Sequence, residues 1–228
     1  MGIMRGIIFD LDGTLVDSLS VTFRAFNHGI TQLGGREHTP QELMKYFGPG
    51  EGEIFAQILG ADKARDAYQA CMAYTDAHLG DVPLHSGIKE LLDRLRSERV
   101  PVSIVTGRSW DTTELILKHH GLLSRFVTVV ANDHVASPKP APEGILLALS
   151  RMGFEPHEVF YVGDSPVDMV AARLAKSSGV AALWDLLAKR ESLEAAKPHH
   201  WAKAPGEVWE IWERQSTCLV SNIAKKAH

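Results

Sequence analysis

The second half of this sequence alternates short apolar runs with amphipathic segments, and this alternation limits the possible folds more than any other feature. After an opening strand at 5–9, buried strands are predicted at 101–105, 126–130, 159–162 and 180–184, with helices between them. Strands that alternate with helices form crossover units of a parallel sheet covered on both faces. The sequence therefore predicts an α/β fold with a doubly wound, Rossmann-like parallel-sheet core.

Residues 17–84 differ from this pattern, because they show helical periodicity and no convincing strand. One apolar stripe at helical spacing is formed by Leu19, Phe23, Phe26, Ile30 and Leu33. Further helices are predicted at 40–47, 51–59 and 62–79. We therefore expect an all-α helical cap domain of residues 17–84, inserted into a core domain of residues 1–16 and 85–228. No element is predicted after Trp212.

The composition limits the classes of partner. Of the 228 residues, 45% are hydrophobic, which suits a globular protein with a sizeable core. The net charge of −4 gives no electrostatic attraction to nucleic acid or to an anionic membrane, and no apolar run approaches the roughly 18 residues of a membrane span. Cys71 and Cys218 predict no disulfide framework. We expect a cytoplasmic protein with no nucleic-acid or membrane partner, either a monomer or a homodimer.

Polar and charged residues occupy the carboxyl ends of the first four predicted strands or the loops that follow them. In chain order they are Asp10 and Asp12, Thr106 and Gly107, Lys139, and Asp164 and Asp168. Open parallel sheets bind their ligands beyond the carboxyl ends of the strands. We therefore expect these residues to form one site.

Asp10 and Asp12 lie two apart on an extended segment, so both carboxylates face the same side. Two close carboxylates repel unless a cation lies between them, and hard oxygen ligands favour Mg²⁺. Asp10 is then placed to attack phosphorus and form an aspartyl-phosphate. Asp12 is placed to protonate the leaving oxygen and later to activate water. Taken alone, the triplet fits a turn or a helix cap as well.

The second acidic pair lies where the fourth strand meets a helix. Pro166 suits the first turn of that helix, and Asp168 can return to the same side as Asp164 four residues earlier. Both aspartates also suit a helix N-terminus without any metal. We predict Asp10, Asp12, Asp164 and Asp168 as the metal site, with Asp168 either in the outer shell or paired with Lys139.

Four residues are predicted to bind the substrate: Thr106, Gly107, Arg108 and Lys139. The Thr106 hydroxyl and the Gly107 amide can hold phosphate oxygens. Lys139, between two prolines, can neutralise charge on Asp10 and on the transferred phosphoryl group. Arg108 either binds a second anionic group of the substrate or is a solvated arginine at a helix start.

Together these motifs resemble the haloacid dehalogenase superfamily, specifically its phosphatase branch with a helical cap and the phosphoglycolate phosphatase-like group. The resemblance is carried by Asp-Leu-Asp-Gly-Thr at 10–14, then Thr106, Lys139 and the acidic segment 163–168. It implies Asp10 as nucleophile, Asp12 as general acid and base, and Thr106 with Lys139 as phosphoryl ligands. It also implies that the late aspartates complete a Mg²⁺ site.

The function expected from these features is a Mg²⁺-dependent phosphomonoester hydrolase. Its substrate is expected to be a small phosphorylated metabolite, such as a phosphoglycolate-like compound or a sugar phosphate. A sugar phosphomutase similar to β-phosphoglucomutase and an inorganic pyrophosphatase are the enzymatic alternatives. A catalytically silent regulatory or interaction module is the alternative outside enzymology, and it is disfavoured because no catalytic position is missing.

Overall fold

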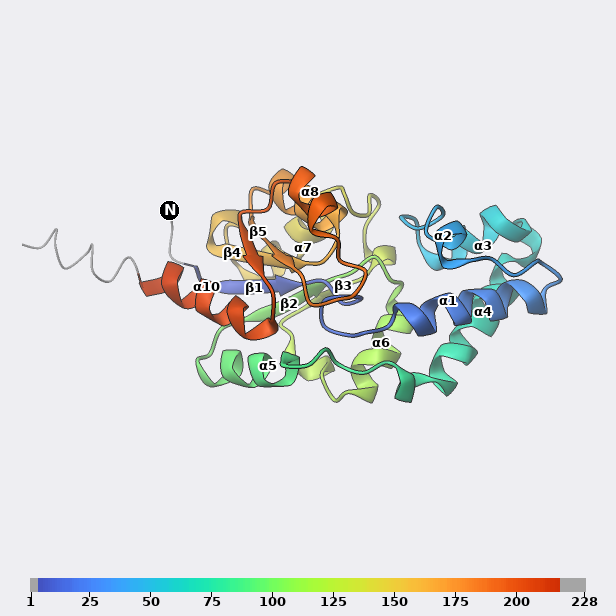
Figure 1. Ribbon diagram of the computed structural model, residues 1–228, viewed down its shortest axis with the longest axis horizontal. Helices are drawn as coiled ribbons and strands as arrows, with labels where there is room; N and C mark the ends of the chain where they lie inside the picture. Colours follow the sequence, from blue (N-terminus) through green and yellow to red (C-terminus); the bar gives the residue numbers. More distant parts are fainter. Residues whose placement is uncertain (1–3, 218–228) are drawn as a thin grey trace, which may run out of the picture.

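The computed structural model describes residues 4–217, and in this part of the chain six parallel strands form one sheet (Figure 1). The strands are β1 (Gly6–Phe9), β2 (Val102–Val105), β3 (Val129–Val130), β4 (Val159–Gly163), β5 (Ser178–Ala182) and β6 (His200–Ala202). Their order is β3-β2-β1-β4-β5-β6, and every neighbouring pair is parallel. The predicted doubly wound α/β fold is confirmed.

Helices cover both faces of the sheet. One face packs against α5 (Ile88–Ser97), α6 (Trp110–His119) and α10 (Pro205–Thr217), and the other against α7 (Glu143–Met152), α8 (Pro166–Leu174) and α9 (Arg190–Ala195). Strand β1 shows why: Ile7 and Phe9 belong to the first core cluster and Ile8 to the second, since successive side chains alternate. Short 3₁₀ turns occur at Leu79–Asp81, Leu123–Arg125, Asn132–His134 and Pro156–Glu158.

The segment between β1 and α5 forms a separate helical body at the right of the sheet in Figure 1. It contains α1 (Leu19–Gln32), α2 (Pro40–Leu43), α3 (Glu51–Leu59) and α4 (Ala61–Ala77). These helices enclose their own apolar cluster, in which the rings of Phe26 and Phe55 stack with centroids 5.0 Å apart. This separate cluster supports the predicted division into a core and a cap of residues 17–84, which we retain as a proposal.

The chain enters and leaves the cap through two segments that pair with each other. The amide of Asp17 donates to the Pro83 carbonyl at 2.9 Å, and the amide of His85 donates to the Leu15 carbonyl at 3.0 Å. Val16 and Leu84 form an antiparallel bridge between these two bonds. The two connections therefore form one paired hinge directly after the Asp10–Thr14 loop.

Helices α1 and α4 approach closely at Gly29. A Cβ at this position would lie 2.4 Å from the carbonyl oxygen of Ala67. We expect Gly29→Ala to lower the free energy of unfolding by about 1–3 kcal/mol, because the added methyl group forces the helices apart. The matched control is Gly52→Ala in α3, where a Cβ meets no atom within 4 Å. The free energy of unfolding of both variants is measured by denaturant titration. Equal values for Gly29→Ala and Gly52→Ala would contradict the close packing at Gly29.

Several sequence-based boundaries need correction. The last strand, β6, was not predicted, because His200 to Ala202 is short and has no clear alternation. Strand β5 begins at Ser178 rather than at Val180, since Ser178 and Gly179 are buried although their types suggest a turn. Helix α5 is capped by Gly87 in a left-handed conformation.

Other elements also differ in length from the prediction. Helix α2 ends at Leu43 rather than at Phe47, and β3 is limited to two residues. Helix α10 continues past Trp212 to Thr217, where no element was predicted, and Cys218 lies outside the described residues. Among residues 4–217 no helix combines the length and the apolar character needed to cross a bilayer.

Candidate active site

Three carboxylates converge at the carboxyl ends of β1 and β4. Asp10 follows β1, Asp164 follows β4, and Asp168 lies in the first turn of α8; one oxygen of each lies within 4.8 Å of the others. The strands β1 and β4 are direct neighbours, with Phe9 paired to Val162, and this pairing brings Asp10 and Asp164 together. The convergence predicted for the first and fourth strand ends is present.

Gly13 allows the loop after Asp10 to pass over Asp164. Its φ is +72°, and a Cβ there would lie 2.4 Å from an oxygen of the Asp164 carboxylate. The next residue, Thr14, donates its hydroxyl to Asp164 Oδ1 at 3.0 Å. The Gly-Thr pair therefore positions the second acid as well as turning the chain.

Lys139 lies between Asp10 and Asp168, with 9% of its side chain exposed. Its Nζ lies 2.7 Å from Asp168 Oδ1 and 2.9 Å from Asp10 Oδ1. The contact with Asp10 is an ion pair without the alignment of a hydrogen bond, so Asp10 Oδ1 is buried with no hydrogen-bond partner among the described residues. The predicted pairing of Asp168 with Lys139 is present, and its role in the outer shell of a metal stays a prediction.

Tyr161 and Ser165 hold this ion pair in place. The Tyr161 hydroxyl donates toward the Val105 carbonyl at 3.0 Å and lies 3.1 Å from Asp168 Oδ1, and Lys139 donates to it at 3.2 Å. The amide and hydroxyl of Ser165 donate to the second oxygen of Asp168. The sequence analysis missed Tyr161, because an aromatic residue inside a buried strand reads as core.

Burial determines the protonation of these acids. It raises the pKa of Asp10 to about 7, although Lys139 opposes the shift, and it raises the pKa of Asp164 well above its usual range, with Asp168 and Asp10 adding to the effect. The pKa of Lys139 is raised despite its burial, because Asp10 and Asp168 favour its charge. Without a cation, Asp10 and Asp164 therefore hold protons more readily than free carboxyl groups do, and a divalent cation would take the place of those protons.

Asp12 faces a different set of partners. Arg108 donates to it from Nη2 at 2.7 Å and from Nε at 3.0 Å, and the Ser18 hydroxyl donates to it as well. Burial opposes its ionisation, but Arg108 and Ser18 outweigh burial, so the pKa of Asp12 lies below its usual value. Its carboxylate is not one of the three that converge, and its assignment as a metal ligand stays a prediction.

Arg108 connects the core to the cap. Its Nη2 also donates to the Thr22 hydroxyl of α1 at 2.7 Å, and its Nη1 lies 3.6 Å from Glu51 Oε1 at the start of α3. Glu51 in turn accepts from the amide of Ser109 at 2.8 Å and from the hydroxyl of Thr112 at 2.9 Å. Arg108 is therefore buried and engaged, and a direct contact with substrate stays a prediction.

Glu51 and Thr22 were missed in the sequence analysis. The helix predicted at 51–59 is present as α3, but the prediction gave no role to Glu51, which is buried in its first turn. Its contacts with the core come from residues more than fifty positions away and leave no local pattern.

Thr106 and Gly107 lie at the end of β2 as predicted. The Thr106 amide donates to the Val130 carbonyl at 2.9 Å, and its buried hydroxyl accepts from the Arg108 amide at 3.2 Å. Gly107 borders the same cavity as Asp10 and Lys139. Their role in holding phosphate oxygens stays a prediction.

A cavity of about 520 Å³ lies between the cap and the carboxyl ends of the strands. Asp10, Asp12, Lys139 and Asp164 form part of its wall, and apolar side chains of the cap form another part. Its volume is within the usual range of small-molecule sites.

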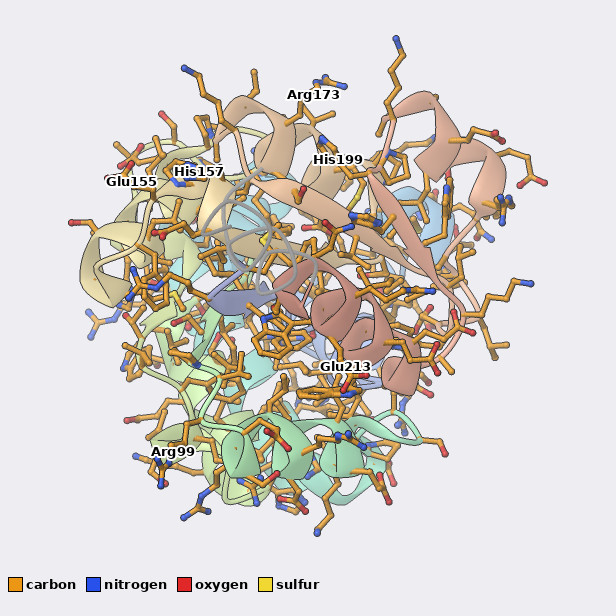
Figure 2. All side chains as sticks on the ribbon, turned by 90° about the vertical axis from the view of Figure 1, so that its left-hand side faces the viewer. Arg99, Glu155, His157, Arg173, His199 and Glu213 are labelled. Atoms are coloured by element: carbon orange, nitrogen blue, oxygen red, sulfur yellow. The ribbon has the colours of Figure 1, made fainter. Side chains whose placement is uncertain are left out.

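A second cavity of about 440 Å³ lies at the opposite end of the sheet, before the strands begin. His157, Arg173 and His199 border it, and Figure 2 shows them on the face away from the cap. Ligands of open parallel sheets bind at the carboxyl ends of the strands. The cavity beside Asp10 is therefore the candidate active site.

Comparison with known proteins gives a family. Residues 7–184 match the family model described as haloacid dehalogenase-like hydrolase. Pyrophosphatase PpaX of Bacillus velezensis is 31% identical over 211 residues, which cover 91% of this chain and 96% of the relative. Phosphoglycolate phosphatase of Aquifex aeolicus is 30% identical over 183 residues, which cover 79% and 85%.

The fold has a close counterpart among solved structures. A predicted phosphoglycolate phosphatase from Haemophilus somnus superposes with a TM-score of 0.80 at 22% identity, over 92% of this chain and 99% of its own. The expected enzyme class, a phosphatase, is confirmed by the family model together with the two relatives. From its matched residues and these relatives, the chain belongs to the haloacid dehalogenase-like hydrolase family.

Proposed function

We propose that this chain is a Mg²⁺-dependent phosphomonoester hydrolase that acts on a small phosphorylated metabolite through an aspartyl-phosphate on Asp10. The observation that carries the proposal is the convergence of Asp10, Asp164 and Asp168 beside Lys139 in one cavity. Such a set supplies a nucleophile, oxygen ligands for a cation and a positive charge for the phosphoryl group.

The donors fit Mg²⁺. Asp10 and Asp164 are the residues that would hold it, because Asp168 is already bonded to Lys139, Tyr161 and Ser165. Asp10 Oδ1 lies 2.9 Å from Lys139 Nζ and has no other partner among the described residues, so one of its lone pairs is left for such a ligand. When bound, Mg²⁺ offsets the negative charge of the carboxylates and of the phosphoryl oxygens.

The protein side chains then divide the chemical work. A carboxylate oxygen of Asp10 attacks phosphorus, and Lys139 stabilises the charge that moves onto the phosphoryl oxygens. Asp12 is ionised in this arrangement and is ready to take a proton from the water that cleaves the intermediate. Asp12 can protonate the leaving oxygen only after its own carboxylate has taken up a proton, and this requires that its hydrogen bond with Arg108 is broken first.

Release of inorganic phosphate tests the proposal. With Mg²⁺ and an aryl phosphate, we expect equal amounts of alcohol and inorganic phosphate, because water completes the reaction. A phosphomutase would return the phosphoryl group to its substrate, so turnover of a sugar phosphate without free phosphate would favour that alternative. A preparation that consumes neither compound would contradict both activities.

Inorganic pyrophosphatase is the second candidate, because the relative at 31% identity carries that name. The same Asp10 chemistry would apply, with phosphate as the leaving group. Side-by-side rates on pyrophosphate and on phosphomonoesters separate the two candidates.

A further inference from the structure

The two halves of the active-site cavity differ in chemical character. The core half carries the charged groups around Asp10, whereas the cap half is lined by apolar side chains. The apolar side chains from the cap are Leu19, Phe23, Phe26, Met44, Phe47 and Ile54. The Phe47 ring lies 5.9 Å from that of Phe23 and 5.5 Å from that of Phe26, so the three rings form one aromatic wall, of which Phe47 is the partly exposed member because Phe23 and Phe26 are buried. A phosphate ester placed for attack by Asp10 would extend its leaving group into the space that this wall borders.

Exposed apolar side chains gather at the same cavity. Met44 of the cap is 54% exposed, and Val167 and Leu187 of the core are 42% and 48% exposed. Such side chains leave apolar surface in water, and their grouping at one site indicates a surface that a ligand covers. Cap and core thus present apolar surface to the same space.

The cations of the cavity offer little to a second anionic group. Lys139 is paired with Asp10 and Asp168, and Arg108 is paired with Asp12 and Glu51. Lys189 borders the cavity, but it is exposed at the start of α9. Glu51 stands beside Arg108 in the same space, so a carboxylate or second phosphate would meet a like charge.

The cavity is also large for the smallest phosphate compounds. At about 520 Å³ it is within the size range of cavities that hold drug-sized ligands. Phosphoglycolate and pyrophosphate are much smaller than such ligands. Either compound would leave much of the aromatic wall uncovered.

We propose that the substrate of this hydrolase is a phosphomonoester of an apolar alcohol, aliphatic or aromatic, whose leaving group packs against the wall of the cap. The inference rests on the proposed function, because the same Asp10 performs the reaction. The ester P–O bond breaks as the Asp10 O–P bond forms, the alcohol leaves with one proton, and water then releases inorganic phosphate. Phosphoglycolate and pyrophosphate, which the names of the relatives indicate for those proteins, are poor substrates for this chain.

A series of alkyl phosphates tests the inference, because methyl, butyl and hexyl phosphate differ little in the chemistry of the leaving oxygen. We expect kcat/KM, measured by phosphate release with Mg²⁺, to rise by up to about fourfold per methylene that becomes buried. Hexyl phosphate has five more methylenes than methyl phosphate and should exceed it by about 100-fold if about three to four of them become buried, and it should exceed phosphoglycolate and pyrophosphate as well.

A pair of matched variants locates the effect. Met44 and Val127 are equally exposed, at 54% and 55%, but Val127 lies outside the cavity. Met44→Ala should lower kcat/KM for hexyl phosphate by about fivefold, with a smaller change for methyl phosphate, because its side chain covers part of the alkyl group. Val127→Ala should leave both values unchanged.

The outcomes separate the inference from the function beneath it. A preference for phosphoglycolate or pyrophosphate that Lys189→Ala removes would overturn the apolar substrate and leave the hydrolase in place. Equal rates along the alkyl series would overturn it in the same way. Absence of phosphate release from every compound, with Mg²⁺ present and the protein folded, would overturn both.

Discussion

Asp10→Asn lowers the rate of phosphate release by about 10⁴-fold or more, since an amide cannot form the acyl-phosphate that Asp10 forms. The substitution is nearly isosteric, and the buried site keeps a group of the same size beside Lys139. Burial raises the pKa of Asp10 to about 7. At pH 8 the wild-type carboxylate is therefore ionised, and its loss of hydration lowers the stability of the folded protein, whereas the neutral amide has no such effect. The variant should therefore unfold at no lower temperature than the wild type at that pH.

Asp17→Asn is the matched control for Asp10→Asn. Asp17 belongs to the same motif segment, but it is exposed, and its side chain makes no described contact with the cavity. Phosphate release and thermal unfolding are measured for both variants with Mg²⁺ and an aryl phosphate. Turnover that survives in Asp10→Asn and is lost in Asp17→Asn would place the nucleophile elsewhere.

Removal of divalent cations abolishes turnover, and excess Mg²⁺ restores it. The physical reason is that Asp10, Asp164 and Asp168 lie within 4.8 Å of one another, so their full ionisation beside a dianionic phosphoryl group needs more positive charge than Lys139 alone supplies. Phosphate release is measured after incubation with excess chelator and again after Mg²⁺ is added. Full activity in the chelator would exclude the metal from the reaction.

Thermal unfolding gives a readout of the same site without substrate. The pKa of Asp10 in the folded protein is about 7, above its ordinary value of 3.8, so the folded state holds an extra proton between these values. The stability of the metal-free protein therefore falls as the pH rises through this range. Mg²⁺ competes with that proton, so at saturation we expect it to raise Tm by about 5 °C at pH 8 and by much less at pH 5. A rise of Tm with Mg²⁺ that is the same at pH 5 and at pH 8 would contradict binding of Mg²⁺ at Asp10.

The sequence predicted the elements whose pattern is local. The strand before Asp10, the stripe of α1 and the helix after Pro166 each carry their periodicity or cap within one segment. The acidic positions were predictable for the same reason, because they stand at the ends of recognisable buried strands. Strand β6 gave no such signal, since its three residues are defined by pairing with β5.

The contacts that set the state of Asp12 were beyond prediction from the sequence. Arg108 is 96 positions from Asp12 and 57 positions from Glu51 in the sequence. At these separations the sequence does not indicate whether Arg108 pairs with Asp12, with Glu51, with both or with no acid. Only the packing of the cap against the core places Thr22 and Glu51 around one guanidinium group. The direction of the Arg108 side chain, and therefore its availability to a substrate, depends on that packing.

The paired hinge between cap and core has a consequence for how this architecture tolerates change. Because the Asp17 amide and the Pro83 carbonyl are hydrogen-bonded at 2.9 Å, the whole helical insert starts and ends at one spot on the core. A turn of a few residues would be long enough to close that gap. A different inserted domain could therefore replace the helical cap at this position. Such a replacement would change substrate recognition and leave the strands that carry the acidic residues unchanged.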